Sequence, residues 1–308
     1  MSSTPDAQIP DAHVPDAHVP DAHVEVSVVI PALNAAHCIG AQLEALARQE
    51  VPYAWEVVVS DNGSTDGTAD VVMSFADRLP VRVTTAPERG HARARNAGAR
   101  AARGRKLIYC DADDEVGPGW VVAMAAELDR SDLVGGYVDD ASLNDSDSQQ
   151  WRRTQDHSAL PTKMGFLPLA ITANIGIRAD VLAAIGGFNE SYGEGCGDVE
   201  VCWRAQVKGF SLGYAPDAVV SYRYRTSVRG MGKQMYARGR AEPQLYRDFL
   251  PHGVRRRRAR ETVRSFGTVV VHLPDVVRGK GRRGRWVKRV CLLGGRIRGS
   301  IEHRTFYV

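Results

Sequence analysis

The sequence lacks any apolar run that approaches the roughly 20 residues of a membrane-spanning helix, and no signal peptide precedes its first predicted strand. Its cysteines are few, and their scattered positions fit neither a metal site nor a disulfide framework. We therefore expect reduced, buried thiols and a cytoplasmic protein. With 308 residues, 44% of them hydrophobic, the chain is long and apolar enough to bury a full core.

Acidic residues are scarce toward the C-terminal end. From Arg229 to Val308 there are 21 Lys or Arg against 5 Asp or Glu, whereas Met1 to Val228 carries 19 against 31. The net charge of +4 is therefore the sum of a negatively charged body and a positively charged tail. Basic tails bind either nucleic acid or anionic membrane surfaces.

The apolar residues of the tail distinguish these two partners. Four arginines at 255–258 precede the apolar stretch 266–273, and Trp286 lies within a second basic run. This interleaving favours a helix in the headgroup region of an anionic membrane. We expect no nucleic acid, because no binding module is recognisable and the acidic body would repel phosphates. A basic helical cap folded on the body remains open as a third interpretation.

The first 24 residues form a separate unit. Pro5-Asp-Ala-Gln-Ile is followed by three copies of Pro-Asp-Ala-His-Val, which end at Val24. A five-residue repeat with a proline in each copy cannot sustain a helix, so residues 1–24 are predicted to be a disordered leader.

From Glu25 onward, apolar runs typical of strands alternate with helical patterns. Strands are predicted over residues 26–30, 56–59, 81–84, 106–110, 133–138, 172–177, 210–214 and 218–224, and helices over 38–49, 92–102, 120–128, 179–185 and 199–208. A further helix is expected through Val71 and Phe75, capped by Ser64 or Thr65, with Asp66 fixing the preceding turn. The pattern predicts an α/β protein with a mainly parallel sheet flanked by helices. Residues 25–138 would be its nucleotide-binding half, 139–228 its acceptor half, and 229–308 a basic helical appendage.

The loops after Ile30, Val59 and Tyr109 are expected to share one edge of the sheet. At that edge the apolar run 107–109 turns into Asp111, Asp113 and Asp114. Ligands of open α/β sheets bind beyond the carboxyl ends of the strands, and carboxylates bind divalent cations that bridge phosphates. The Asp-Ala-Asp (DXD) pattern alone is equally compatible with a solvated acidic turn.

Six segments in order strengthen the functional interpretation, because together they resemble a family 2 glycosyltransferase of the GT-A fold. They are VSVVIPALN (26–34), VVVSDNGSTDGT (57–68), GHARARNAGARAARG (90–104), YCDADD (109–114), GGFNE (186–190) and GDVEVCWRAQVKGF (197–210). The resemblance implies a Rossmann-like sheet and a hexosyltransferase-like enzyme that uses a nucleoside-diphosphate sugar. By the same resemblance, the residues that border the nucleotide base would be Pro31, Ala32, Asn34, Asp61 and Asn62.

The resemblance also implies roles at the diphosphate. Asp113 would bind Mg²⁺ or Mn²⁺ directly, and Asp111 would contact ribose or a water of the metal shell. Arg93 and Arg95, near the start of a helix, could reach the diphosphate or the base. Many relatives add a metal-binding His on a later strand, but residues 218–225 read AVVSYRYR. We therefore expect a weak cation requirement, with Arg223 or Arg225 taking over part of the leaving-group charge.

A general base is expected at 197–200, where the family usually has a Glu-Asp pair. Here Gly197 replaces the first member, so the base would be Asp198, with Glu200 as the alternate and helix capping as the structural interpretation of Asp198. Deprotonation opposite the leaving group predicts an inverting transfer.

The expected acceptor is a lipid-linked or cell-envelope glycan, which implies polysaccharide biosynthesis by a peripheral enzyme at the inner face of the cell membrane. The departures at Gly197 and at the missing His leave a noncatalytic sugar-nucleotide- or glycan-binding protein as the alternative. A nucleotidyltransferase is disfavoured, because Pro31-Ala-Leu-Asn does not resemble a Gly-rich phosphate loop.

Overall fold

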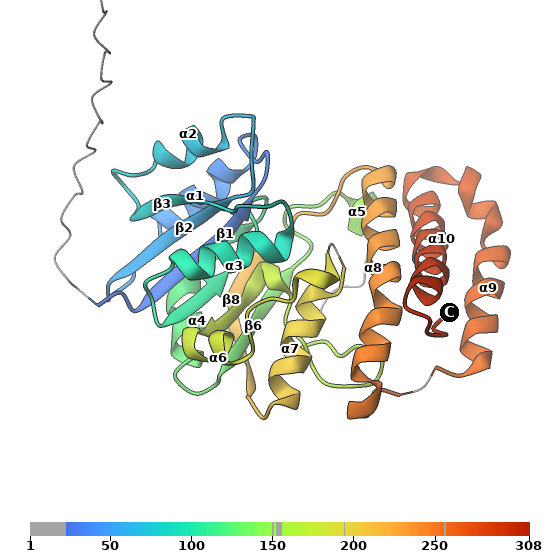
Figure 1. Cartoon of the computed structure of the whole chain (residues 1–308). Coiled ribbons are helices and arrows are strands. Elements are labelled where there is room, and N and C mark those ends of the chain that lie inside the picture. Colours follow the sequence, from blue (N-terminus) through green and yellow to red (C-terminus); the bar gives the residue numbers. More distant parts are fainter. Residues whose placement is uncertain (1–22, 150, 152–155, 194, 256) are drawn as a thin grey trace, which may run out of the picture.

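The computed structural model describes residues 23–149, 151, 156–193, 195–255 and 257–308 (Figure 1). All but two residues of the predicted leader lie outside the described residues. The strands of the described residues are β1 (Val26–Ala32), β2 (Trp55–Asp61), β3 (Val81–Thr85), β4 (Lys106–Tyr109), β5 (Glu115–Val116), β6 (Leu133–Asp139), β7 (Ile175–Arg178) and β8 (Leu212–Ser221).

Helices connect the strands and form the C-terminal region. They are α1 (Ile39–Ala47), α2 (Thr68–Met73), α3 (His91–Ala101), α4 (Trp120–Glu127), α5 (Ser146–Gln149), α6 (Ala179–Ala184), α7 (Gly197–Val207), α8 (Val228–Phe249), α9 (Ala259–Val271) and α10 (Gly279–Glu302). Short 3₁₀ turns add η1 (Thr172–Asn174), η2 (Glu190–Tyr192), η3 (Leu250–His252) and η4 (Leu273–Val277).

The described strands form one sheet of eight in the order β3-β2-β1-β4-β7-β6-β8-β5. β1 to β4 are parallel, β7 runs antiparallel between β4 and β6, and β8 is parallel to β6. The short strand β5 is antiparallel to β8. The predicted mainly parallel α/β sheet is therefore confirmed.

Hydrophobic cores cover both faces of the sheet, which is why its central strands are continuous apolar runs. Val28 and Ile30 of β1 point to the core formed with α1, α2 and α4. Val29 points to the opposite core, where Trp203 of α7 and Leu245 of α8 also pack. Successive side chains of a strand alternate between faces, so one strand serves both cores. Figure 1 shows the helices on the two sides of the sheet.

Two predicted strands differ in the structure. The segment 172–177 begins as the 3₁₀ turn η1, because the buried Asn174 amide donates to Tyr137 O and Ala218 O, both at 2.8 Å, and accepts from Trp120 Nε1. The runs 210–214 and 218–224 form one strand, β8, whose register with β6 shifts between Gly136 and Tyr137. A bulge of this kind separates two apolar runs without ending the strand.

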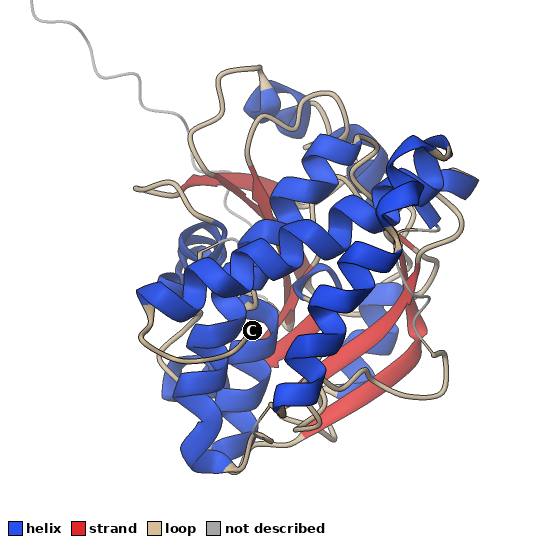
Figure 2. Cartoon of the chain, turned by 90° about the vertical axis from the view of Figure 1, so that its right-hand side faces the viewer, coloured by secondary structure: helices blue, strands red, loops and turns tan. Residues whose placement is uncertain are grey.

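The C-terminal helices α8 and α10 form a cap on the body, as Figure 2 shows from that side. The helices approach closely because both carry glycines: a Cβ at Gly239 would meet Leu292 O, and one at Gly295 would meet Tyr236 O. α8 reaches the body through Phe249, whose ring lies 5.4 Å from that of Trp203. Within the described residues no helix is both long and apolar enough to cross a bilayer.

A buried charge network holds this cap in place. Glu242 of α8 is 3% exposed and pairs at 2.5 Å with both Lys163 of the body and Arg296 of α10. Burial by itself raises the pKa of Glu242, but the two cations outweigh it and lower the pKa to about 2. A single carboxylate therefore joins three parts of the chain.

The Glu242→Gln variant is expected to lose about 3 kcal/mol of stability at neutral pH, because two cations lose their buried partner. Since the folded-state pKa of Glu242 is lowered from 4.5 to about 2, its stabilisation is present above pH 4.5 and disappears as the pH falls toward 2. Urea denaturation should show the difference between variant and wild type shrinking over that window. Glu44→Gln, which breaks an exposed pair with Arg78, is the control and should change little. A pH-independent difference would contradict this interpretation.

Candidate active site

The carboxyl ends of β1, β2 and β4 lie side by side. Ala32 pairs with Asp61, and Val29 pairs with Tyr109, so the loops that leave these strands flank the end of β1. Pro31 and Ala32 therefore stand between the Asp61 turn and the Asp111 turn. The sequence placed these loops at one edge, and the structure brings them together.

Hydrogen bonds tie the loops after β1 and β2 to each other. Asn34, at a φ of +51°, accepts a bond from Thr65 N at 2.9 Å through its side chain, and its own N–H donates to Ser64 Oγ. Asp66 accepts from Thr68 within its turn, as predicted, and also from Ala36 N at 3.0 Å. The predicted cap is wrong: the N-cap of α2 is Gly67, since Ser64 and Thr65 lie too early in the turn.

The next two candidates, Asp61 and Asn62, also stabilise loops. The Asp61 carboxylate accepts from Ser64 N at 3.2 and 3.3 Å, so it caps a turn that sequence reasoning did not recognise. The Asn62 side chain is 6% exposed and, with its amide nitrogen facing Glu88 O, bonds Glu88 O at 2.9 Å and Gly90 N at 3.0 Å. Both residues therefore shape the edge where the base is expected.

Arg95 of α3 reaches the DXD turn directly. Its guanidinium donates to Asp111 Oδ1 at 3.0 Å and lies 6.0 Å from the centre of the Phe188 ring. Arg95 is 9% exposed, and its Nε is buried without a partner among the described residues. The pair joins α3 to the start of the acidic turn and holds the Asp111 side chain at the sheet edge.

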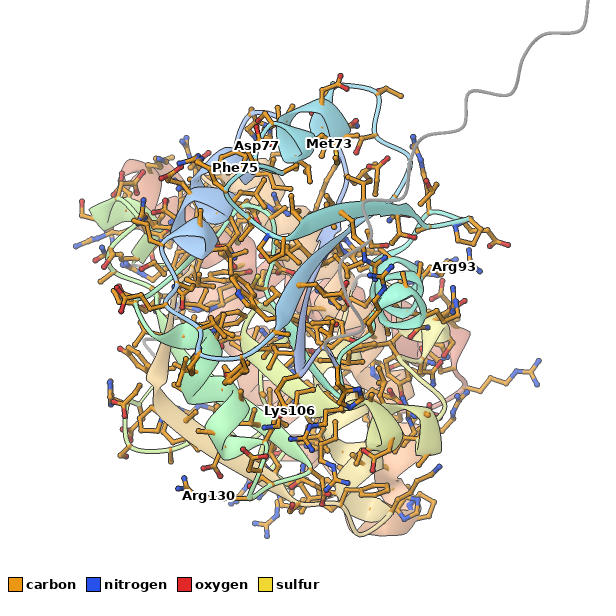
Figure 3. All side chains as sticks on the ribbon, turned by 90° about the vertical axis from the view of Figure 1, so that its left-hand side faces the viewer. Met73, Phe75, Asp77, Arg93, Lys106 and Arg130 are labelled. Atoms are coloured by element: carbon orange, nitrogen blue, oxygen red, sulfur yellow. The ribbon has the colours of Figure 1, made fainter. Side chains whose placement is uncertain are left out.

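Arg93 does not share this environment, and its contact with the donor stays a prediction. It pairs with Glu190 at 3.0 Å and with Glu88 at 2.5 Å. Two residues apart on a helix point in nearly opposite directions, so Arg93 cannot follow Arg95 toward Asp111. Figure 3 shows Arg93, near the start of α3, at the surface.

Two arginines beyond β8 contact the other side of the turn. Arg225 Nη1 lies 3.4 Å from Asp113 Oδ2, and Arg223 donates from Nε to Asp113 O at 3.0 Å. The backbone N–H of Arg223 donates to the buried Asp114 at 2.7 Å. The segment that lacks the family's His thus supplies cations to the DXD turn.

Burial and mutual repulsion set the electrostatics of this turn. The pKa of Asp113 is raised by burial and by the charge of Asp111, against the opposing charges of Arg225 and Arg223. The pKa of Asp114 is raised well above its ordinary value for the same two reasons, burial being the larger. A cation at this turn would relieve the repulsion between the carboxylates.

Sequence reasoning missed Gln42, whose side chain binds the backbone of the DXD turn. This α1 side chain is fully buried, donates to Asp111 O at 3.4 Å and accepts from Val116 N at 2.9 Å. A signal was present, since Gln42 lies on the apolar face that Ile39 and Leu43 define, where a polar residue needs a partner.

The residues present fit a cation shared with a substrate. Within the described residues, no three His, Cys, Asp or Glu side chains gather into a complete metal site. Asp111 and Asp113 supply two carboxylates, and Mg²⁺ or Mn²⁺ bound with a nucleotide commonly uses one or two together with phosphate oxygens. Asp113 also forms part of the wall of a cavity of about 520 Å³ between the start of α1 and residues 223–226, which leaves room for a ligand beside it.

The topology brings Asp198 to the same edge. Asp198 and Tyr222, the residue that follows β8, both raise the pKa of Arg238, so the N-terminus of α7 lies near the point where β8 ends. Because β8, β6 and β4 share one direction, that is also the edge of the DXD turn. The expected N-cap role is wrong: Cys196 is the N-cap, and Asp198 is in the first turn, where it accepts from Val199 N at 2.9 Å.

The alternate base, Glu200, is buried and paired. It is 3% exposed and pairs with Arg204 at 2.6 Å. Arg204 also donates to Gly187 O at 2.7 Å, which links α7 to the GGFNE turn. A carboxylate held in this way has a structural role, which favours Asp198 over Glu200 as the predicted base.

Arg238 of α8 is a second residue that the sequence did not single out. Burial lowers the pKa of its guanidinium, but the neighbouring Cys196, Asp198 and Glu242 raise it above the ordinary value. The contact of Cys196 Sγ with Arg238 O at 3.8 Å fixes this part of α8 beside the start of α7. Asp198 therefore lies in the field of a cation from the C-terminal region.

One edge of the α/β sheet thus carries an acidic turn, the cationic side chains that contact it and a second carboxylate. The model of glycosyl transferase family 2 matches residues 27–186, more than half of the chain, and the chain belongs to this family. It is a glycosyltransferase, and the comparisons give the noncatalytic alternative no support.

Two relatives and one solved structure illustrate the likeness. Glycosyltransferase AglE of Haloferax volcanii is 29% identical over 227 residues, which cover 72% of this chain and 74% of AglE. The UDP-Glc:alpha-D-GlcNAc-diphosphoundecaprenol beta-1,3-glucosyltransferase WfgD of Escherichia coli is 37% identical over 90 residues, 29% of this chain and 35% of that protein. The mannosyltransferase PcManGT of Pyrobaculum calidifontis, in complex with GDP-Man and Mn²⁺, has a TM-score of 0.63 at 19% identity and covers 94% of this chain and 91% of that chain. This last likeness confirms the GT-A fold.

Proposed function

We propose that the protein transfers a sugar from a nucleoside-diphosphate donor to a hydroxyl of a lipid-linked or cell-envelope glycan, with inversion at the anomeric carbon. The observation that carries this proposal is the arrangement at one sheet edge of Asp111 and Asp113, anchored by Arg95 and Gln42, with Asp198 at the start of α7. The name of WfgD, which specifies a diphosphoundecaprenol-linked substrate, supports the acceptor class.

The reaction needs one displacement. Asp198 takes the proton of the acceptor hydroxyl, the oxygen bonds to the anomeric carbon, and the bond from that carbon to the diphosphate breaks. The nucleoside diphosphate leaves from the opposite face, which inverts the configuration. A bound Mg²⁺ or Mn²⁺, held by Asp113 and Asp111, would neutralise charge on the leaving diphosphate.

The remaining residues bind the donor. Pro31, Ala32, Asn34, Asp61 and Asn62 are proposed to border the base, through loops that their own hydrogen bonds fix. Arg95 orients Asp111 toward the ribose. Residues 25–228 would form the catalytic domain, with 229–308 as an appendage at the membrane face where the acceptor lies.

A donor screen tests the proposal. Melting temperatures are measured with a panel of nucleotide-sugars, with and without Mn²⁺, and the donors that stabilise the protein are then assayed for nucleoside-diphosphate release in the presence of lipid-linked glycans. We expect one donor class both to stabilise the protein and to be turned over. Binding without turnover across all donors would contradict the proposal.

Arg225 is expected to make the cation requirement weak. Its guanidinium, 3.4 Å from Asp113, is close enough to share the charge of a diphosphate bound there. Addition of EDTA should lower the turnover of Arg225→Ala by a factor roughly tenfold larger than the factor for wild type. The reason is that a charge-assisted contact of this kind contributes about 1.5–3 kcal/mol. Saturating Mn²⁺ should restore most of the loss, and Arg225→Lys, which keeps the charge, should resemble wild type. Equal EDTA sensitivity in all three proteins would rule out this role.

A further inference from the structure

The apolar stripe of α9 faces solvent. Val263, Phe266, Val270 and Val271 follow the i, i+3, i+7, i+8 spacing of one helical face and are 70%, 45%, 70% and 74% exposed. Leu273 and Val277 of η4, at 57% and 86%, extend the apolar surface beyond the helix. An amphipathic helix of a globular protein normally turns its apolar face toward the core. α9 instead turns its apolar face toward solvent.

The polar side of α9 holds it in this orientation. Thr262 Oγ1 donates to Val308 O, and Arg257 donates to Ser265 Oγ at 2.7 Å. Trp286 of α10 donates to Val269 O at 3.0 Å. Trp286, which the sequence showed only as part of the interleaved basic tail, thus joins α10 to α9. The outward stripe is therefore a property of the folded cap.

Basic side chains border the stripe. Arg260 and Arg264 lie on the face next to Val263 and Val271, are exposed, and make no ion pair with any residue that the structure describes. Residues 255–289 as a whole contain 13 Lys or Arg against two Asp or Glu. The exposed apolar stripe thus lies beside two exposed arginines, in a segment of the sequence with a large excess of basic residues.

We infer that the surface formed by α9 and η4 docks the enzyme on an anionic lipid bilayer, with the apolar stripe in the headgroup and acyl boundary and the arginines against lipid phosphates. A second copy of the chain would satisfy the stripe but would bring two such basic surfaces together, which like-charge repulsion opposes. Nucleic acid would satisfy the charge and leave the stripe in water. Only a negatively charged bilayer matches both features.

The position of α9 suits this role. Figure 1 shows α9 at the outside of the C-terminal cap, with α10 between it and α8. The inference rests on the proposed function in one respect, the membrane location of the acceptor. Turnover of a water-soluble donor does not require docking, so the two can fail separately.

Co-sedimentation of the full-length protein with vesicles tests the inference. Vesicles of phosphatidylcholine alone are compared with vesicles that also contain phosphatidylglycerol, at low and high salt. Phe266→Ser/Val270→Ser removes two exposed apolar side chains, and Arg260→Ala/Arg264→Ala removes two charges. Met73→Ser, which changes a half-exposed apolar residue of α2 on another face (Figure 3), is the matched control.

We expect wild type and Met73→Ser to sediment only with the anionic vesicles, and less so at high salt. Arg260→Ala/Arg264→Ala should bind at least about tenfold more weakly, since each charge alone contributes roughly fivefold at an anionic surface. Phe266→Ser/Val270→Ser should also bind at least about tenfold more weakly, because binding strength scales with the apolar area buried in the bilayer. The melting temperatures and donor hydrolysis in solution of both double variants should match wild type. Unchanged sedimentation of the variants would overturn the inference. So would a concentration-dependent dimer, seen by analytical ultracentrifugation, that Phe266→Ser/Val270→Ser abolishes.

Discussion

Asp113→Asn is expected to lower sugar transfer by roughly 100- to 1,000-fold, because it removes a full negative charge from the group proposed to hold the cation at the diphosphate. The side chain is part of a cavity wall and its ion pair with Arg225 is exposed, so the substitution should leave the fold intact. Stabilisation of the protein by donor and Mn²⁺ should disappear with turnover. Steady-state kinetics and melting curves with and without Mn²⁺ measure both effects.

Glu115→Gln is the control for this experiment. Glu115 lies two residues farther along the chain and pairs with Arg223 at 3.2 Å, so its loss changes the charge of the region but not the proposed cation ligands. It should retain most of the activity. If the two variants were equally active, Asp113 would not be the cation ligand.

Asp198→Asn is expected to lower kcat by roughly 10²- to 10⁴-fold while the affinity for the donor is retained, because an amide cannot accept the acceptor proton. Among the described residues, the only hydrogen bond of this side chain is the local one to Val199 N. Cys196 and Glu242 remain beside Arg238, so the variant should fold. Donor affinity from titration, set beside kcat, separates loss of the base from loss of binding. This division distinguishes Asp198 from Asp113, whose substitution should affect both.

Glu200→Gln should behave differently from Asp198→Asn. The Glu200 carboxylate is buried against Arg204, so its neutralisation should lower the melting temperature and leave the remaining folded enzyme active. If Glu200→Gln were inactive but fully stable while Asp198→Asn were active, Glu200 would be the general base and the proposed role of Asp198 would be wrong.

The nucleotide-binding half was predictable because most of its strands are buried on both faces. β1, β2, β4 and β6 begin and end within two residues of their predicted limits, since largely apolar runs bounded by polar turns leave little ambiguity. The edge strand β3 also lies within these limits, although only Val81 of it is buried. The DXD turn follows directly from the end of β4. Local sequence was sufficient to place both the sheet and its acidic edge.

Partners that are distant in the sequence were not predictable in this way. Arg93 and Arg95 are close in the sequence, yet only the contacts with Glu190 and Asp111 show which one reaches the turn. Glu200 resembled a second base until its partner Arg204 and its burial were known. The outward stripe of α9 depends on bonds to Val308 and to α10, which no local pattern contains.

The most direct test of the central claim is nucleoside-diphosphate release from the best-stabilising donor, measured in wild type, Asp113→Asn and Asp198→Asn together with donor affinity. The account predicts turnover in wild type alone, with donor binding weakened in Asp113→Asn and preserved in Asp198→Asn. Turnover that survives both substitutions would contradict it.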